Sequence, residues 1–227
     1  MAIYAISDLH LGISSGKPMD IFGPKWENYL EILKENWQST VAPDDLVLVP
    51  GDSSWAMYIS EAEEDFRFIH QLNGIKLISK GNHDYWWETL SKLNKYVDEK
   101  GFSTIRFMHN SVYVHEGVAI CAAKGYPDNG KTEEDEKFYR REVSRLQLSL
   151  DMAKKTDAKV IYVMLHYPPM LQSDFARLME EYGVSRCFYG HLHGASHKMA
   201  HEGLFGGVEY NLVSADYLQF KPKLVMK

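Results

Sequence analysis

Five short apolar runs, each closed by a polar or glycine-containing turn, constrain the fold of this chain more than any other feature. They are AIYAIS before DLHLG, DLVLVP before GDSSW, IKLISK before GNHDYWW, VIYVML before HYPP, and RCFYG before HLHG. Continuous apolar runs of this length are typical of buried strands. We therefore expect several buried strands, each with a polar turn at its carboxyl end.

Helical patterns separate several of these runs, at residues 26–37, 61–72, 87–98 and 133–154. Alternating strands and helices indicate an α/β domain, in which ligands bind beyond the carboxyl ends of the strands. Two further stretches, 112–123 and 208–218, have the pattern of meander strands, so the sheets are expected to be mixed. A chain of 227 residues without a repeat or a linker fits one domain over residues 1–227.

The composition narrows the functional classes. The longest apolar run is too short to span a bilayer, so we expect no membrane span. A net charge of −6 makes nucleic acid an unfavourable partner, because such binding needs Lys and Arg to neutralise phosphates. No basic leader or cleavage site precedes the first strand, which favours a cytoplasmic protein. Cys121 and Cys187 lie in apolar runs, which favours buried free thiols over a disulfide.

Carboxylate, imidazole and amide side chains gather in the turns after the apolar runs. Each cluster alone is equally explained by an ordinary strand-end turn or cap. The whole set indicates metal binding, because imidazole nitrogen with carboxylate or amide oxygen suits divalent manganese, iron, zinc or nickel. The clusters contain no cysteine, which argues for an open catalytic site rather than structural zinc. The set is Asp8, His10, Asp52, Asn82, His83, Asp84, His166, His191 and His193.

The order of these motifs carries a family resemblance. DLH at 8–10, GD at 51–52, GNHD at 81–84, a single histidine at 166 and GHLH at 190–193 follow one another along the chain. This series resembles the calcineurin-like metallophosphoesterases over most of the sequence, and five ordered motifs make the resemblance specific. The stretches KPMDIFGPKW, GDSSWAM and GNHDYWW resemble more narrowly a bacterial branch of phosphohydrolases. The resemblance implies a four-layer αββα sandwich of two mixed β-sheets, with the site at the strand ends.

The resemblance also implies a role for each motif residue. The first of two metal ions would bind Asp8, His10 and His193. The second would bind Asn82, His166 and His191, with Asp52 bridging the two ions. His83 would face the substrate and contact the phosphoryl group or protonate the leaving oxygen, while Asp84 would orient the His83 ring.

The charge of such a site supports a phosphate substrate. Two divalent ions carry four positive charges and the carboxylates of Asp8 and Asp52 remove two, so about two positive charges remain to attract an anion. Ions roughly 3.5–4 Å apart share a hydroxide and clamp the attacking and leaving oxygens during in-line displacement at phosphorus. The expected function is therefore hydrolysis of a phosphomonoester or phosphodiester, most favourably of a small molecule.

Other residues leave two interpretations open. Trp55 and Trp86 are as consistent with a substrate-facing wall as with the core, whereas core packing is favoured for Trp87. The segment 14–24 is either a substrate-facing loop or passive surface. Segment 131–145 has the pattern of a solvated helix face, and substrate docking by Arg140, Arg141 and Arg145 is the less favoured reading. The remaining histidines are expected at the surface or in packing: His70, His109, His115, His197 and His201.

Two alternative functions remain. A non-catalytic binding module with the same fold is disfavoured because every expected ligand is present. A nuclease is suggested by DLHLG, but the acidic balance and the absence of an added domain count against it. Nothing in the sequence indicates a groove for a phosphoprotein substrate. The physiological substrate, the native metals and the oligomeric state are left open, because one fold hosts many functions.

Overall fold

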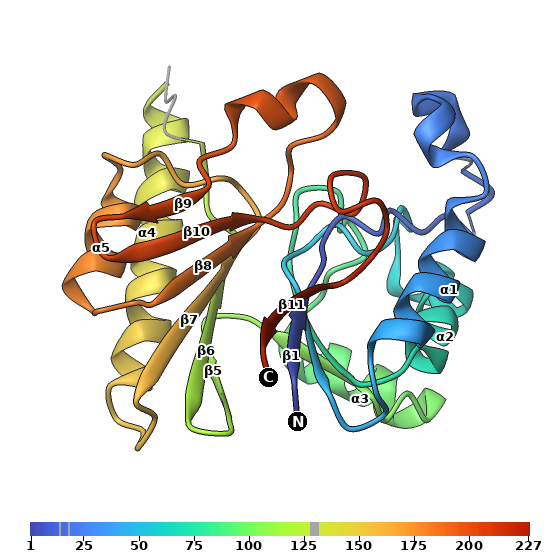
Figure 1. The fold of residues 1–227 in the computed structure, drawn as a ribbon, viewed down its shortest axis with the longest axis horizontal. Helices are drawn as coiled ribbons and strands as arrows, with labels where there is room; N and C mark the ends of the chain where they lie inside the picture. Colours follow the sequence, from blue (N-terminus) through green and yellow to red (C-terminus); the bar gives the residue numbers. More distant parts are fainter. Residues whose placement is uncertain (14, 18, 128–131) are drawn as a thin grey trace.

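Two β-sheets pack face to face in the computed structural model, which describes residues 1–13, 15–17, 19–127 and 132–227 (Figure 1). The first sheet has the order β11-β1-β2-β3-β4, with β1 at Ile3–Ala5, β2 at Leu46–Val49, β3 at Ile75–Ser79, β4 at Ile105–Met108 and β11 at Lys223–Met226. The second has the order β5-β6-β7-β8-β10-β9. Its strands are β5 Val112–His115, β6 Val118–Ala123, β7 Val160–Leu165, β8 Arg186–Tyr189, β9 Gly203–Phe205 and β10 Val208–Leu212.

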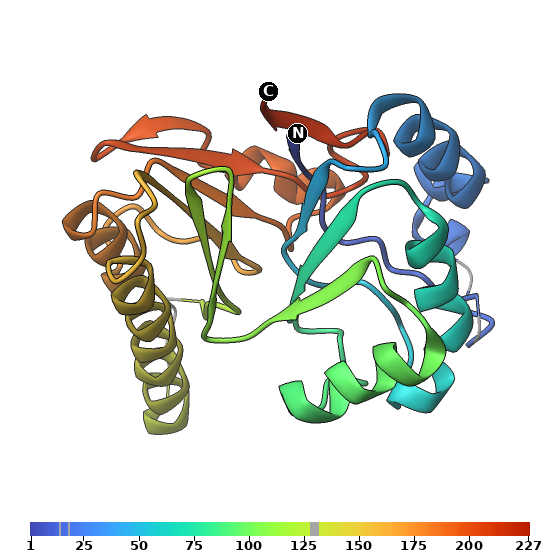
Figure 2. The ribbon, with the colours of Figure 1, turned by 90° about the horizontal axis from the view of Figure 1, so that it is seen from below.

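Helices cover the outer face of each sheet, which makes four layers (Figures 1 and 2). The first sheet carries α1 Tyr29–Thr40, α2 Glu63–Gln71 and α3 Leu90–Lys100, and the second carries α4 Glu133–Ala153 and α5 Asp174–Glu181. Short 3-10 helices lie at Asp20–Phe22, Pro24–Trp26, Ile59–Glu61 and Gly194–Met199. The hydroxyls of Thr89, Thr132 and Ser173 accept backbone N–H groups at the starts of α3, α4 and α5, which explains why these helices begin there.

Three apolar cores follow from the period of two in the strands. In β1, Ile3 and Ala5 face the opposite sheet and meet Ile120 of β6 in the core between the sheets. Tyr4, between them in the sequence, points the other way and packs in the core that includes Trp37 of α1. Because both faces of these strands are covered, their sequences are continuously apolar.

Parallel pairing brings the motif turns to one edge of the molecule. β1, β2, β3 and β4 are parallel neighbours, as are β6, β7, β8 and β10, so their carboxyl ends point in common directions. A parallel bridge between Ser7 and Ser214 joins the end of β1 to the segment after β10. The carboxyl ends of the two sheets therefore meet where the polar turns lie.

The predicted fold class is confirmed: the chain is an αββα sandwich of two mixed sheets, with antiparallel pairs β1–β11, β5–β6 and β9–β10. The stretch 208–218, expected to form meander strands, holds only β10, which ends at Leu212, and Asp216 beyond it lies beside the site. The helix predicted from residue 26 begins at Tyr29, after Asn28 in a left-handed conformation. Helix α5 and strands β4, β9 and β11 were not predicted, and each is short, at eight, four, three and four residues.

Membrane-spanning helices are not found among the residues that the structure describes, because none of the helices there combines the necessary length and apolarity.

Candidate metal centre

The turns that present the motif side chains contain unusual backbone. Asp8, His10, Asp52 and His191 have φ values of 58°, 46°, 53° and 71°, in the left-handed region that side-chain-bearing residues rarely adopt. Such conformations cost free energy and cluster at functional sites, where the surrounding structure holds them in place. All four residues belong to the predicted ligand set. Positive φ values also occur outside it, at Asn28, Asn110, Glu116, Gln219 and Phe220.

Two motif glycines allow these turns to pack against carboxylates. A Cβ atom built on Gly81 would overlap the side chain and backbone nitrogen of Asp52, and one built on Gly190 would overlap the carboxylate of Asp8. Any larger residue at either position would displace a carboxylate. The glycines of GNHD and GHLH are therefore required by close approach of one loop to the next.

One group of donor atoms comes from the turns after β1 and β8. His193 Nε2 lies 3.3 Å from Asp8 Oδ1 and 3.3 Å from His10 Nε2. His10 Nε2 is 3.8 Å from the same Asp8 oxygen. The other Asp8 oxygen accepts from the Ser7 hydroxyl, and the His191 backbone N–H lies 3.1 Å from both oxygens. Three donor atoms from opposite ends of the sequence thus converge on one point.

A second group comes from the turns after β3, β7 and β8. Asn82 Oδ1 lies 2.6 Å from His166 Nε2 and 2.8 Å from His191 Nδ1. The His166 Nδ1 atom lies 3.1 Å from the Pro50 carbonyl, and an Nδ1–H that donates there directs Nε2 toward a metal that displaces its proton. This is the second set of ligands that the sequence resemblance implies.

Asp52 stands between the two groups. Its Oδ2 atom is 3.8 Å from His10 Nε2 in the first group and 3.3 Å from His166 Nε2 in the second. Its Oδ1 atom is occupied, because it accepts the backbone N–H of His83 at 2.8 Å. A single oxygen therefore faces both donor sets.

The donor set fits a pair of divalent ions. It combines imidazole nitrogens with carboxylate and amide oxygens, which first-row divalent metals accept. Asp8, Asp52 and His166 are at most 1% exposed, and buried carboxylates are costly unless a cation or hydrogen-bond donor offsets their charge. The ring nitrogens of His10 and His193 face each other at 3.3 Å, so one cation could bind both.

Both carboxylates are ionised at neutral pH. Burial opposes ionisation of Asp8, but hydrogen bonding to His193 and the charges of neighbouring imidazoles outweigh it and lower the pKa. Burial likewise opposes ionisation of Asp52, and the adjacent His166 outweighs it, so this pKa is also lowered. Their negative charge is therefore available to a metal cation.

The four imidazoles fall into two classes. Burial lowers the pKa of His10 and of His191 to about 4, so both rings are neutral and ready to bind metal. Burial acts in the same direction on His193 and His166, but their carboxylate partners dominate and raise the pKa values to about 10 and about 9. Since only neutral imidazole is a ligand, a metal must displace protons from these two rings.

Asp216 completes the first group and was not predicted from the sequence. Its Oδ1 atom lies 2.8 Å from His193 Nδ1, and its Oδ2 atom accepts the Gly194 backbone N–H at 3.1 Å. A carboxylate on one ring nitrogen orients the other toward a metal. The segment VSADYL that contains Asp216 has no motif, so only its place opposite His193 reveals this role.

His197 also contacts this network. Its Nε2 atom is 3.2 Å from Asp216 Oδ2, so this histidine belongs to the surroundings of the site. Of the other histidines expected outside it, His70 packs on Phe102 and contacts Thr104, as predicted for a packing residue.

Asp84 holds two loops together rather than touching the His83 ring. Its carboxylate accepts backbone N–H groups from Gly81, Asp52 and Ser53 at 2.7, 2.8 and 2.9 Å, and the Trp86 indole N–H at 3.1 Å. Burial and the nearby Asp52 raise its pKa to about 7. The expectation that Asp84 orients His83 finds no hydrogen bond among the described residues, where His83 Nδ1 is buried without a partner.

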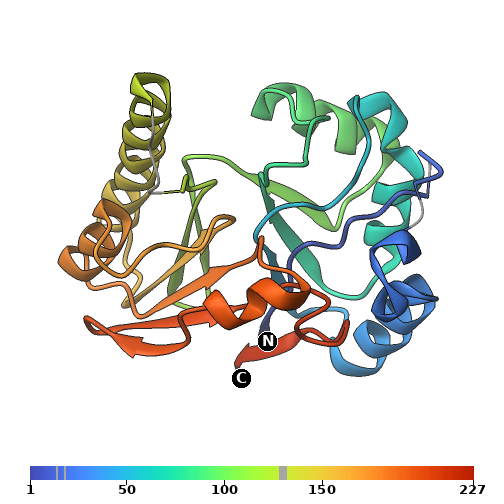
Figure 3. The same cartoon turned by 90° about the horizontal axis from the view of Figure 1, so that it is seen from above.

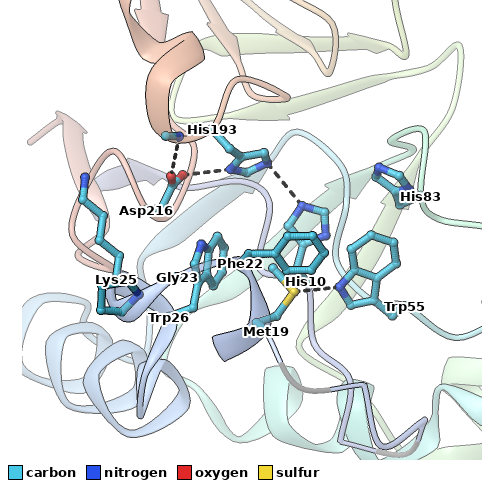
Figure 4. Close-up of a pocket in the computed structure, with 12 residues that line it drawn as sticks. His10, Met19, Phe22, Gly23, Lys25, Trp26, Trp55, His83, His193 and Asp216 are labelled. Carbon is cyan, nitrogen blue, oxygen red and sulfur yellow. Dashed lines mark hydrogen bonds and ion pairs between the residues drawn. The ribbon is translucent and has the colours of Figure 1, made fainter.

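A cavity of about 700 Å³ opens beside the first donor group (Figure 4). His10, His83 and His193 line it on one side, and Trp26, Trp55, Phe22 and Met19 line it on the others. The Trp55 ring stacks on His10, with centroids 4.8 Å apart and planes 21° apart, and lies 4.5 Å from the His83 ring. The wall that faces the metal centre is therefore mostly aromatic.

The structure distinguishes the two tryptophans that the sequence left open. Trp55 is half-buried and lines the cavity, whereas Trp86 is 1% exposed and packs in the core against Phe66. Trp87 packs on Phe107, as expected for a core residue. In segment 14–24, Met19 and residues 22–24 line the cavity, while positions 14 and 18 lie outside the described residues.

Comparisons with solved structures show the same fold in distant proteins. A protein of unknown function from Aquifex aeolicus is 15% identical, with 98% of this chain and 95% of that chain covered and a TM-score of 0.52. A phosphopantetheinyl hydrolase from Mycobacterium tuberculosis is 14% identical, with 99% and 95% covered and a TM-score of 0.58. A Thermus thermophilus protein is 13% identical, with 99% and 97% covered and a TM-score of 0.61. At these identities the likeness concerns the fold.

The family follows from a direct match to the sequence. Curated proteins give no match to this chain. The model of the calcineurin-like phosphoesterase family matches residues 1–195, which contain all five motifs and both groups of donor atoms. The protein therefore belongs to the calcineurin-like phosphoesterase family and is a metal-dependent phosphoric ester hydrolase.

Proposed function

We propose that the protein hydrolyses a small phosphomonoester or phosphodiester at a centre of two divalent ions bridged by Asp52. The observation that carries this proposal is the position of Asp52 Oδ2, which faces His10 of one donor group and His166 of the other. The ions would be held by Asp8, His10 and His193 on one side and by Asn82, His166 and His191 on the other. Members of the family use such a dinuclear centre, which supports the assignment.

Two bound ions supply Lewis-acid polarisation of the phosphoryl oxygens and a water of lowered pKa as the nucleophile for in-line attack. The chain's own residues position the substrate. The ionised carboxylates of Asp8 and Asp52 leave such a centre with about two positive charges, which favours an anionic phosphate. Asp84 maintains the spacing of the GD and GNHD loops through its backbone hydrogen bonds.

His83 is proposed to contact the reacting group. It is half-buried, lines the cavity, and its backbone N–H is fixed by Asp52 Oδ1 at 2.8 Å. Burial lowers its pKa, which favours a neutral ring able to donate one N–H to a phosphoryl or leaving oxygen. The GD loop that carries Asp52 thus also positions His83 beside the donor groups.

The aromatic cavity is proposed to take the leaving group. Trp26, Trp55 and Phe22 offer flat apolar surfaces beside His83. Aromatic side chains bind rings and apolar chains through large buried areas, at low conformational cost. The favoured substrates are therefore phosphate esters with an aromatic or apolar group next to the scissile bond.

The direct experiment combines metal content with turnover. Purified protein is analysed for bound metals, and hydrolysis of p-nitrophenyl phosphate and bis(p-nitrophenyl) phosphate is measured with manganese or with a chelator. We expect close to two metal ions per chain and turnover that the chelator abolishes and manganese restores. The ratio of the two rates assigns the monoester or diester preference. A protein that binds no transition metal and hydrolyses neither ester would instead be the non-catalytic binding module.

A further inference from the structure

A second cavity, of about 600 Å³, shares no lining residue with the aromatic cavity. Lys80 follows β3, His109 follows β4 and Lys124 follows β6, while Arg141 and Arg145 project from α4. Residues 87–90, at the start of α3, form the opposite wall. In Figure 3 the green α3 and the olive α4 flank this edge of the molecule. We call this cavity the cationic cleft.

The charge of the cleft is opposite to that of the chain. Four cationic side chains line it against two carboxylates, in a protein whose net charge is −6. Glu88 is paired with Lys92 on α3, outside the cleft, at 3.0 Å. The buried Glu142 is paired with Arg145 at 2.5 Å. Positive charge is therefore in excess inside the cleft.

The two lysines carry this excess. Lys80 and Lys124 are both half-buried, and within the described part of the chain neither ammonium has a carboxylate at ion-pair distance. Lys124 Nζ lies over the rings of Tyr126 and Tyr167, at 5.9 and 5.7 Å from their centroids. The Glu142 carboxylate acts on both ammonium groups from beyond ion-pair distance, and it already pairs with Arg145 and lies 3.9 Å from Arg141. One carboxylate is thus shared among four cations, and the remaining positive charge suits a site that receives an anion.

The cleft borders the second group of metal ligands. Lys80 directly precedes the GNHD loop that carries Asn82, and the Lys124 carbonyl accepts the His166 backbone N–H at 3.0 Å. The Tyr167 ring contacts both Lys124 and His191, with its centroid 4.5 Å from that of the His191 ring and 5.7 Å from Lys124 Nζ. The cleft therefore lies beside the second donor group.

We propose that the cationic cleft binds a second phosphoryl group of the substrate, through Lys80, Lys124, Arg141 and Arg145. This inference rests on the proposed function, because the first phosphoryl group is the one placed at the metal centre. The substrate class is then a phosphate ester with two separate phosphoryl groups and an aromatic or apolar part. Arginine and lysine together suit such a group, since guanidinium binds phosphate in a bidentate manner and ammonium adds point charge.

The test uses non-hydrolysable probes, so that it reads binding and not turnover. Alkane bisphosphonates with three to eight carbons between the phosphorus atoms are compared by calorimetry with the monophosphonates of equal chain length, on manganese-loaded protein. We expect one linker length at which the bisphosphonate binds about tenfold more tightly than its monophosphonate. In Lys124→Gln/Arg141→Gln this ratio should fall to near one. The single variants Lys124→Gln and Arg141→Gln should show intermediate ratios, and they replace the double variant if it does not fold.

Arg140→Gln is the matched control, because Arg140 lies on the same helix but pairs with Glu136 at 2.6 Å, outside the cleft. It should keep the wild-type ratio. A ratio near one at every linker length in the wild type, or an undiminished ratio in the double variant, would overturn the proposal. Turnover of p-nitrophenyl phosphate and bis(p-nitrophenyl) phosphate by the same samples tests the proposed function separately. Absence of turnover of both esters overturns that function, whereas the ratio alone decides on the cleft.

Discussion

Asp216 Oδ1 lies 2.8 Å from His193 Nδ1, so a carboxylate from the segment after β10 orients an imidazole from the turn after β8. The contact leaves His193 Nε2 directed at Asp8 and His10, 3.3 Å from each. It also means that the centre depends on the C-terminal segment beyond residue 195, where the family match ends. We therefore expect the metal affinity of the first group to depend partly on a residue outside the motifs.

Asp216→Ala should weaken metal binding without removing a ligand. Loss of a carboxylate behind a ligating histidine typically lowers metal affinity or activity by 10- to 100-fold. The dissociation constant of the more weakly held ion should therefore rise by about this factor. Calorimetric titration of metal-stripped protein with manganese measures it. Asp98→Ala, an exposed carboxylate on α3, is the control and should bind like the wild type. Equal affinities of the two variants would contradict the orienting role.

His83→Ala and Asp52→Asn should both lose activity, but only Asp52→Asn should also lose bound metal. His83→Ala removes a group proposed to contact substrate, so both ions stay bound while kcat falls by about 10²- to 10⁴-fold. Asp52→Asn removes the bridging charge, so metal content and turnover fall together. Metal analysis beside p-nitrophenyl phosphate kinetics separates the two effects. His115→Ala, a histidine of β5 outside every motif, serves as the control. Full activity of His83→Ala would contradict the proposed contact between His83 and the substrate.

Phe22→Ala should change substrate preference and leave the metals in place. The Phe22 side chain is 62% exposed on the rim of the aromatic cavity and lies parallel to Trp55, with planes 8° apart. Its removal should raise KM for p-nitrophenyl phosphate by about three- to tenfold, because part of an aromatic contact is lost. The KM for methyl phosphate should not change. An equal effect on both esters would exclude a contact with the leaving group.

Lys76 should make stability depend on pH. Its ammonium is fully buried and donates to the carbonyls of Leu72 and Gly74 at 2.5 and 2.8 Å, and burial lowers its pKa to about 7. An unfolded lysine holds its proton up to about pH 10.4, so between these values the unfolded state binds more protons and stability rises with pH.

The matched variant is Lys76→Met, which keeps the length of the side chain and removes its titration. The free energy of unfolding of the wild type, minus that of Lys76→Met, should increase from pH 7 to pH 10 by at most about 1.4 kcal/mol per pH unit. Urea unfolding at pH 7, 8 and 9 measures this difference. Parallel pH profiles of the two proteins would show that Lys76 titrates normally in the folded state.

Much of the fold was predictable because it depends on local patterns. The five apolar runs and the helices between them were recognised, since burial on both faces of a strand leaves a continuous apolar segment. Strands β9 and β11 were missed for a related reason. The three residues of β9 are all exposed, and β11 pairs only with β1, so neither has to be apolar throughout.

The candidate donors that the structure brings together were also named from the sequence, because each motif places them within a few residues of a strand end. The roles that were missed depend on contacts between residues that are far apart in the sequence. Trp55 and Trp86 follow similar motifs, yet the first lines the cavity and the second packs beneath the loops. From the sequence, Asp84 was expected to orient His83. Only the structure shows that its carboxylate binds the backbone of the GD loop instead.

The sequence by itself determined the fold class, the family and the residues able to bind metal. The reason is that strand burial and donor chemistry both depend on residues that are close together in the sequence. Only the tertiary structure decided that Asp216 supports His193, that aromatic rings wall the centre, and that Lys80, Lys124, Arg141 and Arg145 surround one cleft. The reason is physical: these residues come from strands and helices of different layers. The distances between these residues are therefore set by how the two sheets pack, which cannot be read from a local sequence pattern.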